Sequence, residues 1–587
     1  MDGNGGASDA AVPILEETFY ALSRKQYSYT VTLTSSGLYL KKNFNGAVKT
    51  DFIHVNDIIG CKCMRNNGKS NDCACRPVKN TNAANCQVRV PYDDSTDCSA
   101  YLCVYAYILK NVAMKNERRD KMTVTLRFRN YNNYNDNLKT AQKWKHSISS
   151  LMRARSEGRT IVALPDNRYL ANRLLVIVNP KSGVGKAREI FQRKVAPILI
   201  MADVDYDLHI TCMQNDARNL VRTSNIYKWG RGIIVLGGDG LMFEIINGLM
   251  ERSDWQRAFE YLTLAIIPGG SGNGLAKSIS FETNEPYTED PIVISALNIV
   301  SGNRCAMDLV RVETISQVVY SFLSVGWGFI ADIDIESERL RILGSPRFTI
   351  WTIARLIGLR SYPARLSYNK IDNLDSNIKI NNFTASSFYD CQDIIDDGPV
   401  SIEFGMDPLE EFDSRERVES FSSAISKRTF MSVKEATSFQ SIPDVVEESD
   451  IWIRGPASKI PPLSEPVPAD WEVVEEEFVM IHASYLSHIS EDVLLAPDSK
   501  LNDGVIWLLI VRNGISRANF LQFLLALSSG THLNIPNVEM VPVRAFRLEP
   551  LSGGSHIVVD GELLKHSPVQ AEIMPGITNV YARQKCS

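Results

Sequence analysis

Between Arg173 and about Tyr368, short apolar runs alternate with segments of helical periodicity. The apolar runs are "LLVIVNP", "DYDLHITCMQ", "GIIVLGGDG" and "LTLAIIPGG". Strands buried on both faces have such continuous apolar runs, and helices between them allow the strands to run parallel. We therefore predict a parallel sheet with helices on both faces. Ligands of such sheets bind at the carboxyl ends of the strands, where the glycine-rich turns of this chain lie.

Residues 26–156 have a different pattern, in which short alternating strands are followed by one long helix. We expect the strands in "YSYTVTLTSSGLYLKK", "YLCVYAYIL" and "KMTVTLRFRN", and the helix in "NDNLKTAQKWKHSISSLMRAR". A small curved sheet plugged by a carboxyl-terminal helix with a central tryptophan, here Trp144, resembles a pleckstrin-homology domain. The alternative is a β-rich extension without a lipid site. Residues 1–25 are expected to form a disordered amino terminus.

The rest of the chain divides into an acidic insertion and a second β-rich region. Residues 371–476 are rich in Ser, Asp, Glu and Pro, which predicts a mostly disordered insertion. Short apolar runs separated by turns return after it and predict antiparallel strands with one helix, "SRANFLQFLLALSS". The predicted domains are an α/β domain at 170–320 and an antiparallel β-sandwich formed by 321–370 together with 477–587.

Composition limits the functions that the chain can have. With 587 residues, 44% hydrophobic and 22% charged, it is globular and long enough for about three domains. A net charge of -5 gives no general attraction to nucleic acid, so no nucleic-acid partner is expected. The start lacks the pattern of a signal peptide, and no run of about 18 apolar residues occurs. We expect a cytoplasmic protein that associates peripherally with the plasma membrane or internal membranes.

Seven of the eleven cysteines lie between Cys61 and Cys103. Their spacing is C-x-C rather than the C-x-x-C of zinc ribbons, and no histidine lies among them, although His54 is close upstream. Because disulfides are rare in the cytosol, reduced thiols are the favoured interpretation, and a zinc site is the alternative.

The stretch "VIVNPKSGVGKA" has the composition of a phosphate-binding loop but fits neither common template. A Walker A loop needs a glycine where Pro180 stands and a Ser or Thr where Ala187 stands. The dinucleotide fingerprint needs a glycine three residues beyond Gly185, where Arg188 stands. If this loop binds phosphates, it belongs to another class of nucleotide site.

Two further turns place glycines at strand ends. In "IIVLGGDGLMFEIINGLM" a buried strand leads through Gly237 to Gly240 into a helix. The glycines let backbone N–H groups approach an anion while one carboxylate is presented, so Asp239 is a candidate general base, with a helix cap as the alternative. The stretch "AIIPGGSGNGLAKS" repeats the order of strand, glycine-rich turn and helix. All three turns should meet at one edge of the sheet.

Together, "NPKSGVGK", "GGDG" and "PGGSGNGLA" resemble the catalytic domain shared by diacylglycerol kinases and sphingosine kinases. The segment "FLSVGWGFIADIDIESERLRILGSPRF" resembles the part of sphingosine kinases that binds the lipid head, and the similarity continues through "AFRLEP" to "VVDGEL". The chain is therefore identified as a member of the sphingosine kinase family. This resemblance implies that residues 170–320 bind ATP and that the antiparallel β-domain binds lipid. It also implies Mg²⁺ as counterion and transfer of phosphate to the primary hydroxyl of sphingosine and related sphingoid bases, giving sphingosine 1-phosphate.

The resemblance implies roles for individual residues. Asp239 would take the proton from the primary hydroxyl, and Asp334 would anchor the amine and the secondary hydroxyl. Arg341 and Arg347 would grip the phosphates of ATP. The implied nucleotide contacts are Asn179, Pro180, Lys181, Thr211, Asn215, Glu244, Gly270, Ser271, Gly272, Arg341, Arg347, Asp560, Gly561 and Glu562. The implied lipid contacts besides Asp334 are Gly237, Gly238, Gly240, Ser324 and Phe329.

Two positions depart from the family pattern. Gly237 stands where animal sphingosine kinases usually have Ser, as in diacylglycerol and ceramide kinases, and Asp216 replaces a usual His, which we expect to alter only a surface contact. A ceramide or diacylglycerol kinase therefore stays open, although neither lipid has an ammonium group for Asp334. An alternative of another class is a catalytically inactive membrane-binding scaffold. An NAD or NADP kinase would not call for the Asp334 segment.

Apolar residues recur at helical spacing in "RFTIWTIARLIGLRSY". They predict either a helix that faces the core or an exposed face that enters an anionic membrane surface, with Lys181 and Lys186 near the headgroups. The expected partners are thus a sphingoid-base lipid and an anionic membrane surface, and a homodimer is left open. Structural alternatives remain for solvated charges at Arg341 and Arg347, a helix cap at Asp332, a turn residue at Glu562 and a structural histidine at His532.

Overall fold

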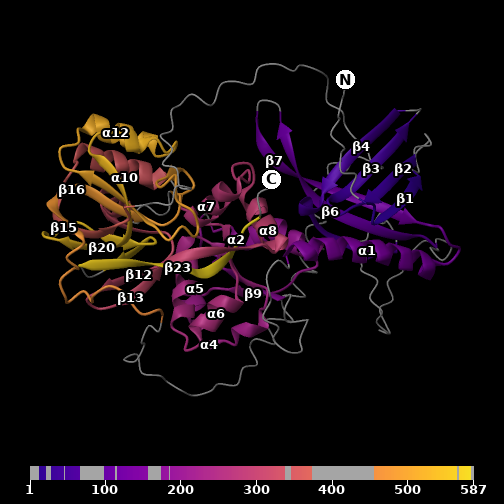
Figure 1. Ribbon diagram of the computed structural model, residues 1–587, viewed down its shortest axis with the longest axis horizontal. Coiled ribbons are helices and arrows are strands. Elements are labelled where there is room, and N and C mark those ends of the chain that lie inside the picture. Colours follow the sequence, from indigo (N-terminus) through magenta and orange to yellow (C-terminus); the bar gives the residue numbers. More distant parts are fainter. Residues whose placement is uncertain are drawn as a thin grey trace, which may run out of the picture. The chain divides into compact units, whose positions relative to one another are not determined.

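The computed structural model describes residues 12–20, 28–44, 47–65, 98–112, 115–156, 173–183, 185–337, 346–372, 455–564 and 568–583 (Figure 1). They form two compact units, one built from residues 12–156 together with 196–204 and the other from the remaining described residues. The first unit holds the predicted amino-terminal β-rich domain, and the second holds the three glycine-rich turns.

The first unit consists of two antiparallel sheets and one long helix. One sheet contains β1 (Leu15–Tyr20), β2 (Ser28–Leu33), β3 (Gly37–Phe44) and β4 (Ala47–His54), and η1 (Val55–Asp57) leads to the other, which contains β5 (Ile58–Met64), β6 (Ala100–Val112) and β7 (Lys115–Phe128). Helix α1 (Tyr134–Ser156) follows β7. Trp144 on α1 is 2% exposed and packs edge-on against Phe19. The predicted strands and helix are confirmed. The expectation of a disordered amino terminus was wrong for Leu15–Tyr20, which form β1 and pair with β2.

Four of the clustered cysteines lie among the described residues. Cys61, Cys63, Cys98 and Cys103 are all free thiols. Burial raises the pKa of Cys63 to about 11. Among the described residues, no group of three or more His, Cys, Asp or Glu side chains could hold a metal ion. These four cysteines therefore form no disulfide, and the zinc alternative stays a prediction. The remaining members of the cluster, Cys73, Cys75 and Cys86, lie outside the described residues.

The second unit contains a parallel sheet with the strand order β9-β8-β10-β11. The strands are β8 (Arg173–Val178), β9 (Asp205–Ile210), β10 (Gly232–Gly237) and β11 (Leu264–Pro268). The helical segments that follow them in the chain are α2 (Ala187–Ile190), η4 (Phe191–Val195), α3 (Ala196–Met201), α4 (Asp216–Thr223), η5 (Ile226–Lys228), α5 (Asp239–Met250), α6 (Trp255–Tyr261), α7 (Gly274–Thr283) and α8 (Pro291–Ser301). Every residue of β10 and β11 is buried, as the continuous apolar runs predict.

After α8 the chain continues mainly as antiparallel strands. These elements are β12 (Arg304–Thr314), β13 (Val318–Ser321), β14 (Ser324–Gly328), α9 (Phe329–Ser337), α10 (Pro346–Ile357), β15 (Tyr362–Lys370), β16 (Glu472–Ser484), β17 (His488–Ser490), β18 (Val493–Leu494), β19 (Ile506–Arg512), α12 (Arg517–Ala526), η8 (His532–Asn534), β20 (Val538–Pro550), β21 (Ile557–Val559), β22 (Glu562–Leu564) and β23 (Val569–Tyr581). Strands β15 and β19 each pair with both β16 and β20, so these four strands close on themselves. Strand β23 pairs with β12, with β20 and, at Val580, with β11. Parallel and antiparallel strands thus belong to one large mixed sheet, and its antiparallel part begins at Arg304, earlier than the predicted boundary at 321.

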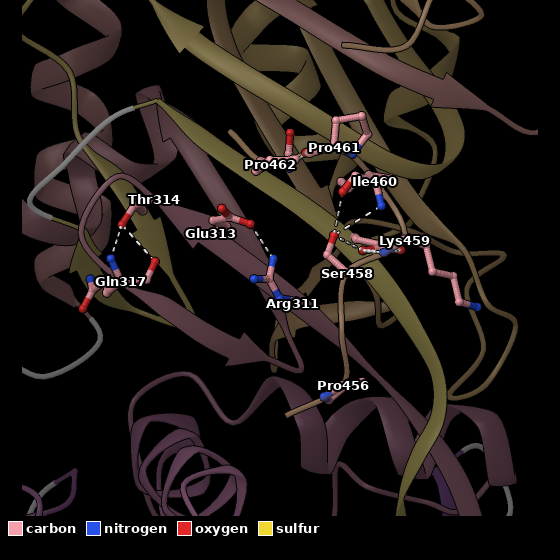
Figure 2. A network of polar contacts seen from close by, with 12 residues as sticks. Arg311, Glu313, Thr314, Gln317, Pro456, Ser458, Lys459, Ile460, Pro461 and Pro462 are labelled. Carbon is pink, nitrogen blue, oxygen red and sulfur yellow. Dashed lines mark hydrogen bonds and ion pairs between the residues drawn. The ribbon is translucent and has the colours of Figure 1, made fainter. Parts of the chain in front are cut away.

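Residues 455–471, which we call the strap, contact this sheet without forming a helix or a strand of their own. Arg547 of β20 and Gln570 of β23 donate hydrogen bonds to backbone carbonyl groups of the strap. The carboxylate of Glu572 on β23 accepts the hydroxyl of Ser458 over 2.8 Å. Figure 2 shows the strap from Pro456 to Pro462 beside β12. The strap is therefore held by side chains of the sheet.

The strap corrects one boundary of the predicted acidic insertion. Residues 455–476 were expected within it, but they form the strap and the start of β16 at Glu472. The proline-rich strap is ordered by hydrogen bonds to its carbonyl groups. The acidic residues that follow it occupy solvent-facing positions at the start of β16. The larger part of the predicted insertion, residues 373–454, lies outside the described residues.

Candidate active site

The turns after β8, β10 and β11 lie at one edge of the sheet. Val178 pairs with Leu236, and Gly237 pairs with Pro268, so the three strands end close together. The pairing continues beyond the strands, because the N–H of Gly269 donates to the carbonyl of Gly237 over 3.0 Å. The predicted convergence of the three turns is confirmed.

Two pairs of glycines bring these turns into backbone contact. A Cβ atom on Gly270 would lie 2.4 Å from the Cα of Gly238, and one on Gly183 would lie 2.6 Å from the carbonyl oxygen of Gly269. Gly183 also has a φ of 53°, in the left-handed region that glycine adopts without strain. A side chain at either position would push the turns apart. The glycines also leave backbone N–H groups unobstructed for an anion.

Asp239 is the first residue of α5 and lies against the turn that precedes α7. Its carboxylate accepts the N–H of Gly274 over 2.9 Å and that of Leu275 over 3.3 Å. Asp239 is 8% exposed. Burial raises the pKa of Asp239, and the backbone donors oppose that rise only in part. A carboxylate held in place with a raised pKa is suited to accept a proton near neutral pH.

The expected nucleotide contacts after β8 and β9 lie on neighbouring loops. The side chain of Asn179 accepts the N–H of Lys181 over 3.0 Å, which shapes the first loop and leaves Lys181 exposed. Thr211 is buried, and its hydroxyl donates to the carbonyl of Val178 over 3.4 Å. Asn215 has a φ of 62° and immediately precedes α4. Both loops follow adjacent parallel strands and so share the sheet edge with the glycine turns.

Glu244 and Glu562 are neighbouring carboxylates near Asp239. Glu244 accepts backbone N–H groups from the start of α4, while its buried Oε2 has no hydrogen-bond partner within the described part of the chain. A Cβ atom on Gly240 would lie 3.4 Å from Oε1 of Glu562. Burial raises the pKa of Glu244, and the charge of Glu562 raises it further. Two mutually repelling carboxylates with an unsatisfied oxygen fit a divalent cation.

Asp560 contacts the β13–β14 connection instead of reaching toward the nucleotide turns as expected. Its carboxylate accepts the hydroxyl of Ser321 over 2.6 Å and the N–H groups of Phe322, Leu323 and Ser324 over 2.9 to 3.0 Å. Burial raises the pKa of Asp560 to about 6. The geometry assigns it to holding the connection that ends at Ser324.

Asp334 lies on α9 and borders the segment of Gly561 and Glu562. A Cβ atom on Gly561 would lie 4.0 Å from Oδ2 of Asp334. The next residue, Glu562, lies against Gly240, which follows Asp239. The expected anchor of the lipid head and the expected base therefore lie on two sides of one short segment.

Phe329, at the start of α9, belongs to an apolar cluster shared with α12. It is 4% exposed, and its ring centroid lies 4.6 Å from that of Phe520. Ile333 and Phe523 belong to the same cluster. Ser324 is buried at the start of β14. Apolar side chains thus lie directly behind the helix that carries Asp334.

Asp332 is not the cap of a following helix, because α9 begins at Phe329. Its carboxylate is 0% exposed and accepts the hydroxyl of Tyr362 over 2.7 Å and the N–H of His556 over 3.0 Å. Arg355 of α10 lies 3.4 Å away. These partners join α9 to α10, to β15 and to the loop before β21. Asp332 therefore fixes the helix that presents Asp334.

Asp216 does more than alter a surface contact. Its carboxylate accepts the N–H of Cys212 over 2.8 Å and lies 3.3 Å from Nε2 of His209. These contacts close the β9–α4 loop, which carries Thr211 and Asn215. The contact with Cys212 is exposed, so the expectation of a surface contact fits, and the contact also shapes this loop.

For two expected site residues the structure describes no side chain, and His532 was expected to be structural. Arg341 lies outside the described residues, and Arg347 lies in α10 at a position where only the backbone is described. Their phosphate contacts stay predictions. His532 is buried with Nε2 3.0 Å from the carbonyl of Leu495, and burial lowers its pKa to about 4. The structural interpretation of His532 is confirmed.

Residues 488–492 contact the turn before α7, although no role was predicted for them. Glu491 accepts a hydrogen bond from Asn273, a residue 218 positions earlier in the chain. No local motif marks such a contact, because the two segments meet only in the folded chain.

Comparison with known families assigns the parallel sheet and most of the antiparallel strands to two family models, one of which is a lipid kinase catalytic domain. The family model described as diacylglycerol kinase catalytic domain matches residues 173–312. A second model, described as YegS C-terminal NAD kinase beta sandwich-like domain, matches residues 462–582. The first match covers the three glycine-rich turns, and the second covers the Glu562 segment.

The chain belongs to the sphingosine kinase family. It is 34% identical to Sphingosine kinase 1 of Homo sapiens over 69% of this chain and 89% of that protein. It is 35% identical to Sphingosine kinase 1 of Caenorhabditis elegans over 68% of this chain and 78% of that protein. Sphingosine kinase 2 of Homo sapiens is 28% identical and aligns with 97% of this chain and 91% of its own. A solved diacylglycerol kinase from Bacillus anthracis str. Sterne covers 70% of this chain and 97% of its own at 15% identity and a TM-score of 0.38, a similarity too low to add to the assignment.

Proposed function

We propose that the protein transfers the γ-phosphate of ATP to the primary hydroxyl of sphingosine and related sphingoid bases, giving sphingosine 1-phosphate. Asp239 is the general base. The observation that carries this proposal is the place of Asp239, buried at the junction of the glycine turns with Asp334 across the Gly561 segment. Membership of the sphingosine kinase family supports the substrate class.

The nucleotide side of the site fits ATP with Mg²⁺. The close approach of Gly238 and Gly270 presents backbone N–H groups to phosphates without a side chain in the way. Glu244 and Glu562 would hold the cation, which neutralises phosphate charge when it is bound. The exposed Lys181 adds a positive charge at the same sheet edge.

The lipid side of the site fits a sphingoid base. The carboxylate of Asp334 would pair with the ammonium group, and the apolar cluster around Phe329 would take the adjoining chain. Diacylglycerol and ceramide have no ammonium, so neither would form a charge-assisted pair with the carboxylate of Asp334.

The reaction needs a proton acceptor and two aligned oxygens. Asp239 removes the proton of the primary hydroxyl of the lipid. The hydroxyl oxygen then bonds to the γ-phosphorus of ATP, while the bond from that phosphorus to the leaving oxygen of ADP breaks. The N–H groups of Gly274 and Leu275 keep the carboxylate in one orientation during this transfer.

The test measures transfer of labelled phosphate from Mg·ATP to sphingosine, ceramide and diacylglycerol in parallel. Wild type should label sphingosine, and Asp239→Asn, which keeps the size of the side chain, should lower kcat by about 10²-fold or more. Asp334→Asn should raise the KM for sphingosine more than it lowers kcat. Label chiefly in ceramide or diacylglycerol would overturn the assignment of Asp334, and transfer to no lipid would favour the scaffold.

We also propose that α10 and α12 form a membrane-facing surface. On α10, Trp351 packs into the core, whereas Ile350 and Ile353 are 49% and 56% exposed. Helix α12 lies beside α10 (Figure 1), and its Leu521 and Leu525 are exposed. Among the described residues, no helix is long and apolar enough to span a bilayer. An apolar face of this kind would let the enzyme reach a substrate that resides in a membrane.

The first unit supports a further proposal, that it has a pleckstrin-homology-like arrangement. Its described strands form sheets of four and three, and α1 with the buried Trp144 follows them. Separately, we propose that the antiparallel part of the second unit is the lipid-binding domain. It would be a β-sandwich of the kind that the matched family describes.

A further inference from the structure

The turn before α7 has two roles in the proposed reaction. In the proposed function Gly270 to Gly272 would face the nucleotide, and the N–H groups of Gly274 and Leu275 hold Asp239. Between them stands Asn273, with a φ of 60° in the left-handed region. Asn adopts this region more readily than other non-glycine residues, because its side chain can hydrogen-bond to the nearby backbone.

Asn273 is held within its own turn and by one residue outside it. Its Oδ1 accepts the N–H of Gly270 over 2.9 Å, and its Nδ2 lies 3.1 Å from the carbonyl of Gly270. The same Nδ2 donates to Oε1 of Glu491 over 2.8 Å. Asn273 is 6% exposed, so loss of that acceptor would leave a buried donor less well satisfied.

Glu491 is tied to the turn by two further hydrogen bonds. Its own N–H donates to the carbonyl of Gly272 over 2.9 Å. Its Oε1 also accepts the hydroxyl of Tyr287 over 2.9 Å. Burial raises the pKa of Tyr287, so that this hydroxyl stays a donor across the working pH range. One carboxylate oxygen thus receives donors from both Asn273 and Tyr287.

The segment that carries Glu491 is itself fixed on α7. The N–H of His488 donates to the hydroxyl of Ser278 over 3.0 Å, and that hydroxyl lies 3.3 Å from the carbonyl of His488. A Cβ atom on Gly274 would lie 2.9 Å from the same carbonyl oxygen. The antiparallel β-domain therefore fixes the loop of the parallel domain that bears the site.

We propose that Glu491 is a positioning residue of the active site, which fixes Asn273 and through it the turn that faces the nucleotide and orients Asp239. This role rests on the proposed function of Asp239 and Gly270. Glu491 acts through hydrogen bonds of its Oε1 atom, and its negative charge is not required.

The test compares Glu491→Ala with Glu491→Gln in the full-length protein, with Asp492→Ala as control. Gln keeps an acceptor oxygen in the same place, and Asp492 is the adjacent, exposed carboxylate. Glu491→Ala should lower kcat/KM by at least about tenfold, because small misplacements of reacting groups are costly, and should raise the KM for ATP. Glu491→Gln and Asp492→Ala should stay within about threefold of wild type. Thermal unfolding of each variant checks that it is folded.

The pH profile separates positioning from a loss of fold. Weaker donors at Asp239 leave burial less opposed, so Glu491→Ala should move the acid limb of kcat/KM to higher pH. Other titratable groups face this site: Tyr287 and Lys277 feel the charge of Glu491, and Glu562 lies beside Gly240. Both Glu491→Ala and Glu491→Gln remove that charge, so the comparison of the two isolates the hydrogen bonds. Glu491→Gln should keep the wild-type limb.

A second variant covers the case in which Glu491→Ala does not fold. Tyr287→Phe removes one donor to Glu491 and should shift the acid limb in the same direction by a smaller amount. Combined with Glu491→Ala, it should add nothing. An unshifted limb in both single variants, or a loss in Glu491→Gln equal to that in Glu491→Ala, would overturn the proposal.

Nucleotide binding distinguishes failure of this proposal from failure of the proposed function. Titration with a fluorescent ATP analogue needs no lipid. If wild type labels no sphingoid base but Glu491→Ala still weakens binding of the analogue, the proposed function fails and positioning by Glu491 stands. If wild type labels sphingosine and Glu491→Ala equals it in both assays, only the positioning role fails.

Discussion

The close contact between Gly270 and Gly238 can be tested by adding a single Cβ atom at position 270. Ala at 270 would add a Cβ atom 2.4 Å from the Cα of Gly238, which is backbone and cannot rotate away. We expect Gly270→Ala to lower the free energy of unfolding by about 1–3 kcal/mol and to reduce kcat, because the turns must separate. Gly553→Ala is the control, since nothing lies within 4 Å of its Cβ position. Chemical unfolding and kcat would be measured together, and equal behaviour of both variants would show that the turns adapt.

Single acidic residues differ in how far the sequence could predict their roles. Asp239 could be predicted, because the glycines around it and the strand before it place it at a known sheet edge. Asp560 could not, since its donors at Ser321 to Ser324 lie more than 230 positions earlier in the chain. Asp332 likewise receives Tyr362 and His556 from distant elements. A carboxylate near a glycine turn can contact substrate or hold distant backbone segments together. Its hydrogen-bond donors in the folded chain show which of these roles it has.

Helix α10 shows, for a whole element, that the sequence alone did not predict which face packs against the core. Its spacing predicted either a core face or an exposed face, and the helix has both. Trp351 and Leu356 pack into the apolar cluster, while Ile350, Ile353 and Ile357 are exposed. Because apolar residues lie on more than one side of this helix, its sequence gives no signal for which side meets the core. That choice depends on α9 and α12, which α10 packs against.

The exposed face of α10 can be tested by changing only its outer residues. Burying the exposed halves of two isoleucines in lipid is worth about 2 kcal/mol, so Ile350→Gln with Ile353→Gln should weaken liposome binding at least about tenfold. Activity on detergent-dispersed sphingosine should be spared. Ile315→Gln with Val473→Gln is the matched control, because both residues are exposed on other elements. Equal loss of activity in detergent and on liposomes would assign the face to folding.

At the scale of the whole molecule, the alternation of strands and helices predicted the parallel sheet, and short runs predicted the antiparallel strands. What the sequence could not reveal is that β23 joins the two sets, because its pairing with β11 and β12 is long-range. Composition also misassigned the strap. Prolines and acidic residues are typical of disorder, yet the strap is held through its backbone carbonyl groups, which every sequence has.

Arg547 is the test of how the strap is attached to the sheet. Its guanidinium donates to the carbonyls of Glu465 and Pro462 and to the side chain of Gln570, and the residue is 4% exposed. Arg547→Met would keep the apolar length and remove these bonds, so we expect a loss of about 2 kcal/mol or more in the free energy of unfolding. The strap should also become sensitive to proteolysis. Because the described contacts of the strap lie on β13, β20 and β23 and on none of the residues that hold Asp239, kcat in detergent should change little.

Arg544 provides the matched control for this experiment, since it lies on the same strand but is exposed. Arg544→Met should change stability by no more than about 0.5 kcal/mol. If the strap of Arg547→Met resists protease as well as that of Arg544→Met, then Gln570 and Glu572 suffice to hold it, and the buried guanidinium serves only the packing of β20. If it is cut faster while kcat is kept, the strap is a separately detachable element, held by the same sheet that carries Glu562 but not needed to form the site.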